Sequence, residues 1–89
     1  MSSLLLGVYN MKLKIHIKLK AGVLDPQGQA TRKALHSLGF TAVEDVRLGK
    51  FIELDIEEND PQRATRIAKE MCDQLLANIV VEEYSIDII

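Results

Sequence analysis

Leu24-Asp25-Pro26-Gln27-Gly28 opens the stretch that decides the fold of this chain, and the stretch continues through Ala34-Leu35-His36-Ser37-Leu38-Gly39-Phe40 to Asp45-Val46-Arg47-Leu48-Gly49-Lys50. An aspartate followed by a proline is typical of a helix start, because Asp suits the N-cap and Pro suits the first helical position. Gly39 suits the left-handed residue that commonly follows a helix. The stretch therefore predicts a capped helix that leads into a β-hairpin, as in a small α+β domain.

The helix is expected to bury one apolar side, and the hairpin is expected to follow it. Helical spacing places four small or aliphatic residues on that side: Ala30, Ala34, Leu35 and Leu38. Residues 43–48 and 50–56 are expected to form two strands that are joined tightly around Gly49. Apolar residues at every second position of residues 52–56 support the second of these strands.

The remaining elements follow from the same kinds of pattern. Residues 12–20 alternate strictly between aliphatic and polar side chains, which is typical of a strand covered on one side. Asn59-Asp60-Pro61 repeats the helix-start signal, and apolar residues at helical spacing follow it: Ala64, Ile67, Ala68, Met71 and Leu75. Residues 79–88 form the last expected strand. The order β-α-β-β-α-β predicts an α+β, ferredoxin-like sandwich with a four-stranded antiparallel sheet and two helices on one face.

Composition limits the classes of function. A chain of 89 residues has room for one domain, which we place at residues 12–89. The net charge of −2, with both signs spread along the chain, gives no reason to expect nucleic acid or an anionic membrane as a partner. The single cysteine, Cys72, excludes an intrachain disulfide and a Cys-based metal cluster, and it fits a reducing cytoplasm.

Residues 1–11 are interpreted as an N-terminal extension. The apolar run at residues 4–9 is short, no Lys or Arg precedes it, and no small-residue cleavage pattern follows it. It is therefore not typical of a signal peptide, and no run in the chain approaches transmembrane length. Met11 stands directly before the first strand, so one hypothesis is that translation begins there and that residues 1–10 are an extension. An intact-mass measurement of the native protein tests this hypothesis.

No set of residues is typical of a catalytic site. The chain lacks both the glycine-rich phosphate loop and the dinucleotide-binding fingerprint. Its first loop, residues 21–23, has neither the paired cysteines of ferredoxin-like metal carriers nor the catalytic arginine of acylphosphatases. His16 and His36 are interpreted as solvent-facing or capping residues, and Cys72 as a small core hydrophobe. We therefore expect no catalytic residue, no cofactor site and no metal site.

Two surfaces remain candidates for contacts. On the open face of the sheet, lysines and a histidine of the first strand lie opposite carboxylates, which is consistent with a solvated charge ladder or with a polar docking surface. At the expected hairpin, Arg47 and Lys50 flank Gly49, and their cations are suited to a carboxylate or phosphate. Alternatively, the hairpin charges only keep the turn soluble.

A series of short fragments appears in a fixed order along the chain: Val23-Leu24-Asp25-Pro26-Gln27-Gly28, Ala34-Leu35-His36-Ser37-Leu38-Gly39-Phe40, Val43 with Asp45-Val46-Arg47, Gly49-Lys50, Glu53-Leu54, Met71-Cys72 and Leu75-Leu76-Ala77-Asn78. In this order and at these spacings, residues 12–88 resemble the PurS family. This family is the small subunit of phosphoribosylformylglycinamidine (FGAM) synthase.

The resemblance implies a non-catalytic accessory subunit that acts in de novo purine (IMP) biosynthesis in the cytoplasm. In this family the small subunit, usually a homodimer, bridges a glutaminase subunit and a large ATP-using synthetase subunit and supports ammonia transfer between them. The resemblance implies a structural role for Asp25, Pro26, Gln27 and Gly28 at the start of the first helix. For His36, Arg47, Gly49 and Lys50 it implies contacts with a partner or a second copy.

An alternative interpretation is an ACT-like module that binds amino acids and regulates other proteins. Such modules share the expected element order, dimerise, and use a glycine near the first strand–helix loop to approach their ligand. Gly22 lies in that loop. The sequence also leaves open whether the chain forms a dimer or a tetramer.

Overall fold

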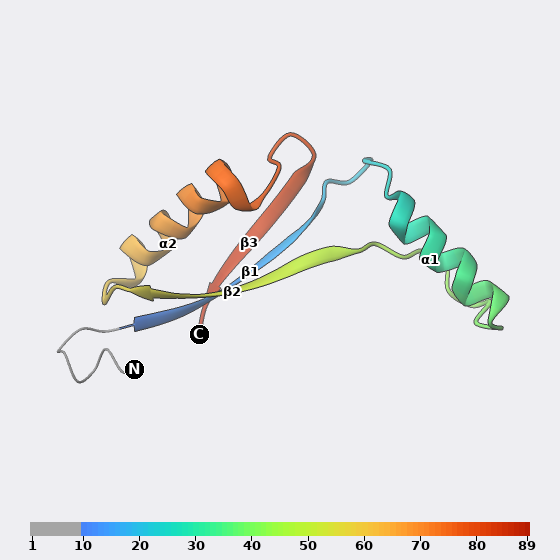
Figure 1. Ribbon diagram of the computed structural model, residues 1–89, viewed down its shortest axis with the longest axis horizontal. Coiled ribbons are helices and arrows are strands. Elements are labelled where there is room, and N and C mark those ends of the chain that lie inside the picture. The colour runs from blue at the N-terminus through green and yellow to red at the C-terminus, as the bar shows by residue number, and fades with distance from the viewer. Residues whose placement is uncertain (1–9) are drawn as a thin grey trace.

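A computed structural model describes residues 10–89 of the chain (Figure 1). Its elements, in chain order, are β1 (Asn10–Leu19), α1 (Pro26–Ser37), β2 (Gly49–Glu57), α2 (Pro61–Met71), the π-helical turn η2 (Cys72–Leu76) and β3 (Glu82–Ile88). The proposed extension lies almost entirely outside the described residues. Because β1 begins at Asn10, the expected domain boundary at residue 12 falls inside the first strand.

Within residues 10–89 the sheet has three antiparallel strands in the order β2-β1-β3. The alternation expected in β1 is confirmed, because Leu13, Ile15 and Ile17 are at most 2% exposed. Helix α2 covers this face of the sheet, where its Ala64 and Ala68 pack near Leu13. The core therefore lies between one face of the sheet and the segment formed by α2 and η2, where Cys72 and Ala77 pack against Ile15 and Ile17.

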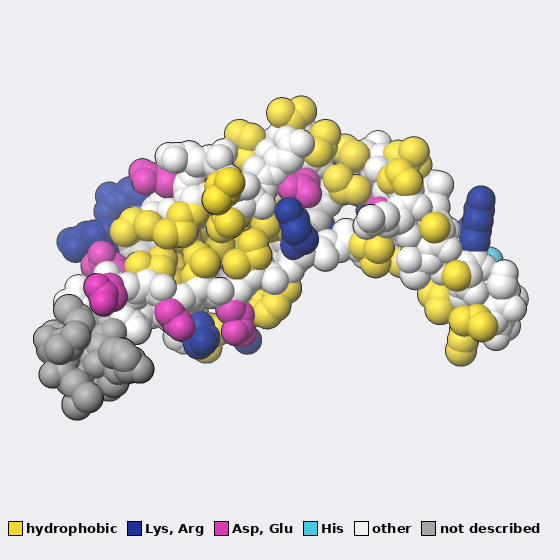
Figure 2. Space-filling view, in the orientation of Figure 1, with side chains coloured by type: hydrophobic (Ala, Val, Ile, Leu, Met, Phe, Trp, Pro, Cys, Tyr) yellow, Lys and Arg dark blue, Asp and Glu magenta, His cyan; other side chains and the backbone are white. Residues whose placement is uncertain are grey.

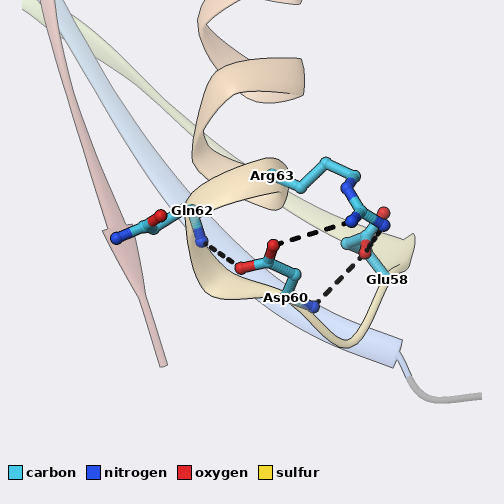
Figure 3. A network of polar contacts seen from close by, with 4 residues as sticks. All are labelled: Glu58, Asp60, Gln62 and Arg63. Carbon is cyan, nitrogen blue, oxygen red and sulfur yellow. Dashed lines mark hydrogen bonds and ion pairs between the residues drawn. The ribbon is translucent and has the colours of Figure 1, made fainter.

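Both predicted helix starts are confirmed. The side chain of Asp25 caps α1 by accepting a hydrogen bond from the Gly28 N–H at 2.8 Å. At the start of α2, Asp60 accepts from the Gln62 N–H at 3.0 Å, while Arg63 contacts Glu58 and Asp60 at 3.1 and 3.7 Å (Figure 3). In each case a carboxylate satisfies a backbone N–H that has no partner inside the helix.

The expected four-stranded sandwich is not what the structure shows. Residues 43–48 lie outside the sheet, and Gly49 is the first residue of β2 rather than the centre of a hairpin. Helix α1 projects beyond the end of the sheet instead of covering it beside α2 (Figure 1). Residues 43–48 run back along α1, because side chains of α1 and of its N-cap residue Asp25, rather than a neighbouring strand, bind their backbone groups.

The apolar side expected on the first helix is largely exposed. Ala30 and Ala34 are exposed, Leu35 is half-buried, and Leu38 is 73% exposed. In the second helical segment Leu75 was expected in the core, but it is 82% exposed within η2. The last strand also begins three residues later than expected, at Glu82. Hydrophobic side chains accordingly appear on the surface along the projecting helix as well as over the sheet (Figure 2).

Candidate functional site

The projecting part of the molecule comprises residues 24–48 and is called the arm; it contains α1 with its flanking residues and residues 43–48, which we call the return segment (Figure 1). The arm leaves the sheet after β1 and rejoins it at the start of β2. All four residues expected at the helix start, and the four expected to contact a partner, lie on the arm or at the beginning of β2. The arm is therefore the candidate site.

Asp25 joins the outgoing and returning chains at the root of the arm. Its Oδ1 accepts from the Gly28 N–H, and its Oδ2 accepts from the Leu48 N–H at 2.9 Å. The residue is only 5% exposed. Hydrogen bonds from the Leu48 and Gly28 N–H groups, aided by the nearby Arg47 charge, hold the pKa of Asp25 below its ordinary value of 3.8. Asp25 is thus both a helix cap and a cross-link between two segments.

Arg47 makes a second connection at the same place. Its guanidinium donates to the carbonyl oxygens of Val23 at 2.9 Å and Lys20 at 3.1 Å. The side chain therefore ties the return segment to the loop between β1 and α1. Arg47 has a role within the chain that the sequence did not predict, and its contact with a partner stays a prediction.

Two further side chains of α1 hold the return segment along the arm. The Arg32 Nε donates to the Glu44 carbonyl at 3.1 Å, and the His36 Nε2 lies 2.6 Å from the Val43 carbonyl. Asp25, Arg32 and His36 follow one another at the spacing of a single helix face. That spacing was the sequence signal that could have identified Arg32, which the prediction missed.

Two glycines allow close backbone contacts at the root. A Cβ on Gly28 would overlap the Val46 carbonyl, and a Cβ on Gly49 would lie 2.5 Å from the Ile17 carbonyl. Both glycines are therefore required by packing. Neither of these glycines has a positive φ. Among the described residues only Gly22 and Gly39 do.

The other predicted site residues lie at the edges of this arrangement. Lys50 reaches the Leu76 carbonyl at 3.4 Å and so faces η2. Pro26 and Gln27 form the first turn of α1, and Gln27 lines a hollow of about 240 Å³ between the arm and the sheet, together with Asp25 and Gly49. The structure thus brings Asp25, Gly28, Arg47 and Gly49 together at the root, while His36 lies farther out and Lys50 points toward η2.

The open face of the sheet is the second candidate surface. Lys12 lies 3.6 Å from Asp55, and Lys18 lies 3.6 Å from Glu83, so two lysines of β1 pair with carboxylates on the neighbouring strands. The exposed ring of Phe51 stacks on His16 with their centroids 4.9 Å apart, and Lys14 lies over the same ring. These exposed pairs contribute little to stability, and their chemistry favours no particular ligand.

Two titratable groups in the core have shifted pKa values. Burial raises the pKa of the Cys72 thiol. Burial, together with a 2.8 Å hydrogen bond from its hydroxyl to Asp73, raises the pKa of Tyr84 to about 12. Both groups are therefore neutral at physiological pH, which leaves the thiol a poor nucleophile. None of the helices within residues 10–89 combines the length and the apolar character needed to cross a membrane.

Comparison with known proteins identifies the family. The family model for PurS, phosphoribosylformylglycinamidine (FGAM) synthase, matches residues 12–89. This chain belongs to the PurS family. Among curated PurS subunits it is 48% identical to that of Bacillus subtilis over 77 residues, which is 86% of this chain and 90% of the relative. It is 49% identical to that of Archaeoglobus fulgidus over 72 residues, covering 81% and 90%.

Solved structures of PurS proteins have the same fold. The B. subtilis PurS structure superposes with a TM-score of 0.81 at 47% identity, covering 89% of this chain and 98% of that one. A chain in the structure of PurLQS from Thermotoga maritima superposes with a TM-score of 0.83 at 33% identity, covering 91% and 99%. PurS structures therefore match the overall fold of this chain, including its projecting arm. The resemblance found in the sequence is confirmed.

Proposed function

We propose that this chain is the accessory subunit of an FGAM synthase in de novo purine biosynthesis. One observation carries the proposal: the chain matches PurS subunits over nearly its whole length, including a chain in the T. maritima PurLQS structure. In this proposal the chain bridges a glutaminase subunit and an ATP-dependent synthetase subunit in the cytoplasm, and it supports ammonia transfer between them. The chain itself contributes no catalytic group.

The structure supports a role in assembly. The arm places several large apolar side chains in solvent, including Leu24 at 64%, Leu38 at 73% and Phe40 at 58% exposure. Such exposure in a small domain is typical of surfaces that are covered in a complex. We propose that the chain forms a homodimer or a tetramer and that the arm takes part in its contacts. In the oligomer a second copy then completes the ferredoxin-like sandwich that one chain leaves incomplete.

The experiment reconstitutes the complex from this chain and the glutaminase and synthetase subunits of the same source. FGAM formation is measured with glutamine and, separately, with ammonia as the nitrogen donor. We expect glutamine-dependent turnover to require the chain, while ammonia-dependent turnover is largely retained without it. Glutamine-dependent turnover that is equal with and without the chain would contradict the proposed function.

A further inference from the structure

The arm is continuous with the rest of the chain at its two ends, which are the loop at residues 20–23 after β1 and the bond between Leu48 and Gly49, where β2 begins. Helix α1 projects beyond the sheet, and no strand packs along it (Figure 1). Gly22 in the loop has a φ of +86°, and open space surrounds the position that a Cβ would take there. Packing against the sheet therefore does not fix the direction in which the arm leaves it.

Hydrogen bonds from one side chain cross this junction. Arg47 donates from Nη1 to the Val23 carbonyl at 2.9 Å and from Nη2 to the Lys20 carbonyl at 3.1 Å. Among residues 10–89, these are the hydrogen bonds that join the arm to the chain outside it. Lys20 is itself held in place, because its N–H donates at 2.9 Å to the carbonyl of Val81, directly before β3. Arg47 thus connects the arm, through Lys20, to the part of the molecule that contains the sheet.

Asp25 makes a different kind of connection. Its two oxygens accept from the Gly28 N–H and the Leu48 N–H, and all three residues belong to the arm. Asp25 therefore holds the start and the end of the arm together, but it does not hold the arm on the sheet. That second connection is suited to arginine, because a planar guanidinium offers several N–H groups in fixed directions and can bind two carbonyls at once.

We propose that Arg47 is a positioning residue, which sets the direction of the arm relative to the sheet by bridging the Val23 and Lys20 carbonyls. The length of the arm amplifies small changes at its root. Helix α1 has 12 residues and is about 18 Å long, so a rotation of about 10° at the root moves its far end by about 3 Å. A shift of this size exceeds the roughly 1 Å by which interface backbones ordinarily move on binding. This role goes beyond the proposed function, because it concerns a single chain and holds whatever the arm contacts.

The test measures distances between two spin labels by pulsed electron paramagnetic resonance. The labels are attached at T41C, in the turn beyond α1, and at S85C on β3, because both positions are exposed. The native Cys72 is fully buried and should not react. Labelled chains are refolded with an excess of the same chain without the two added cysteines, so that each measured distance lies within one chain. We expect a narrow distance distribution with Arg47 present and a distribution at least twice as wide in R47A.

Two further variants separate direction from charge and from local structure. R32A is the matched control, because Arg32 also donates to a backbone carbonyl, that of Glu44 at 3.1 Å, but does so within the arm; it should leave the width unchanged. R47K keeps the positive charge without the planar guanidinium, and its distribution should be wider than that of wild type. Hydrogen exchange of the Leu48 amide, which donates to Asp25, should stay slow in R47A. Circular dichroism confirms that each variant is folded.

The outcomes separate the positioning role from the proposed function. A width in R47A or R47K equal to that of wild type, or an equal increase in R32A, would overturn the positioning role. Fast exchange of the Leu48 amide in R47A would also overturn it, because the return segment would then have separated from α1 instead of changing direction with it. A chain in which R47A widens the distribution as expected, but which does not support glutamine-dependent turnover, would overturn the proposed function and leave the positioning role intact.

Discussion

Replacing Gly49 by alanine tests whether this residue serves the fold rather than a partner. In a strand, alanine is ordinarily more favourable than glycine by roughly 0.5–1 kcal/mol, because glycine loses more backbone freedom on folding. At position 49, however, the added Cβ lies 2.5 Å from the Ile17 carbonyl, and such contacts are essentially never closer than 3.0 Å. The two strands must therefore separate by at least about 0.5 Å where β2 begins to pair with β1.

The magnitude follows from these two opposing effects. Forcing an extra methyl group into packed structure costs about 1–3 kcal/mol, which exceeds the gain in backbone entropy. We expect G49A to lower the free energy of unfolding by about 1–2 kcal/mol, and 1 kcal/mol corresponds to roughly 4–8 °C in Tm for a domain of this size.

Urea denaturation at a fixed protein concentration measures this change, because oligomerisation makes apparent stability depend on concentration. The matched control is K50A, which removes only an exposed side chain with a 3.4 Å contact to Leu76 and should stay within about 0.5 kcal/mol of wild type. If G49A were as stable as wild type, the close approach of β2 to β1 would not explain the glycine. A loss of partner binding with unchanged stability would instead support the contact role predicted from the sequence.

Three further predictions concern pH and packing. The pKa of Asp25 is lowered in the folded chain, so the stability that this carboxylate contributes is present above pH 3.8 and is lost as the pH falls through the lower native pKa. D25N should therefore lose less stability than wild type on acidification, as measured by urea denaturation. The pKa of Tyr84 is raised to about 12, so stability should fall as the pH rises from about 10 to about 12, and D73N should lower the pKa seen in the absorbance titration of this phenol. Ile15 is fully buried, so I15A should lower the free energy of unfolding by about 2–5 kcal/mol, and a smaller loss in urea denaturation would contradict its place in the core.

Local signals predicted the parts of the fold that depend on neighbouring residues. The alternation in β1 and the Asp-Pro helix starts were confirmed, because a strand face and a helix cap are determined within a few residues. The strand at residues 43–48 was not found in the sheet, because pairing depends on what lies beside a segment. Here the side chains of the N-cap residue Asp25 and of Arg32 and His36 in α1 occupy one edge of it.

Sequence reasoning singled out residues that lie together at the root of the arm but not their geometry, and their contact with a partner stays a prediction. The helix start at Asp25 and the residues around Gly49 were identified from sequence, and the structure places them together at the root of the arm. The interaction of Arg47 with the Val23 and Lys20 carbonyls joins residues that are more than twenty positions apart. No local sequence pattern predicts such a contact. The Arg47 guanidinium was expected to face a partner, but it binds the loop after β1 in its own chain.

The exposed apolar side of α1 shows that a helical pattern of apolar residues does not by itself predict burial within one chain. Helical spacing of Ala30, Ala34 and Leu38 predicts a buried face, yet in the single chain these residues are exposed. Such periodicity indicates that one face of the helix is buried. It does not indicate whether the face is buried by the same chain or by another one. The strand pattern at residues 43–48 shows the same behaviour, since it predicts a paired strand where one edge is unpaired. Both discrepancies lie on the arm, and the contact with a second copy proposed above accounts for both of them.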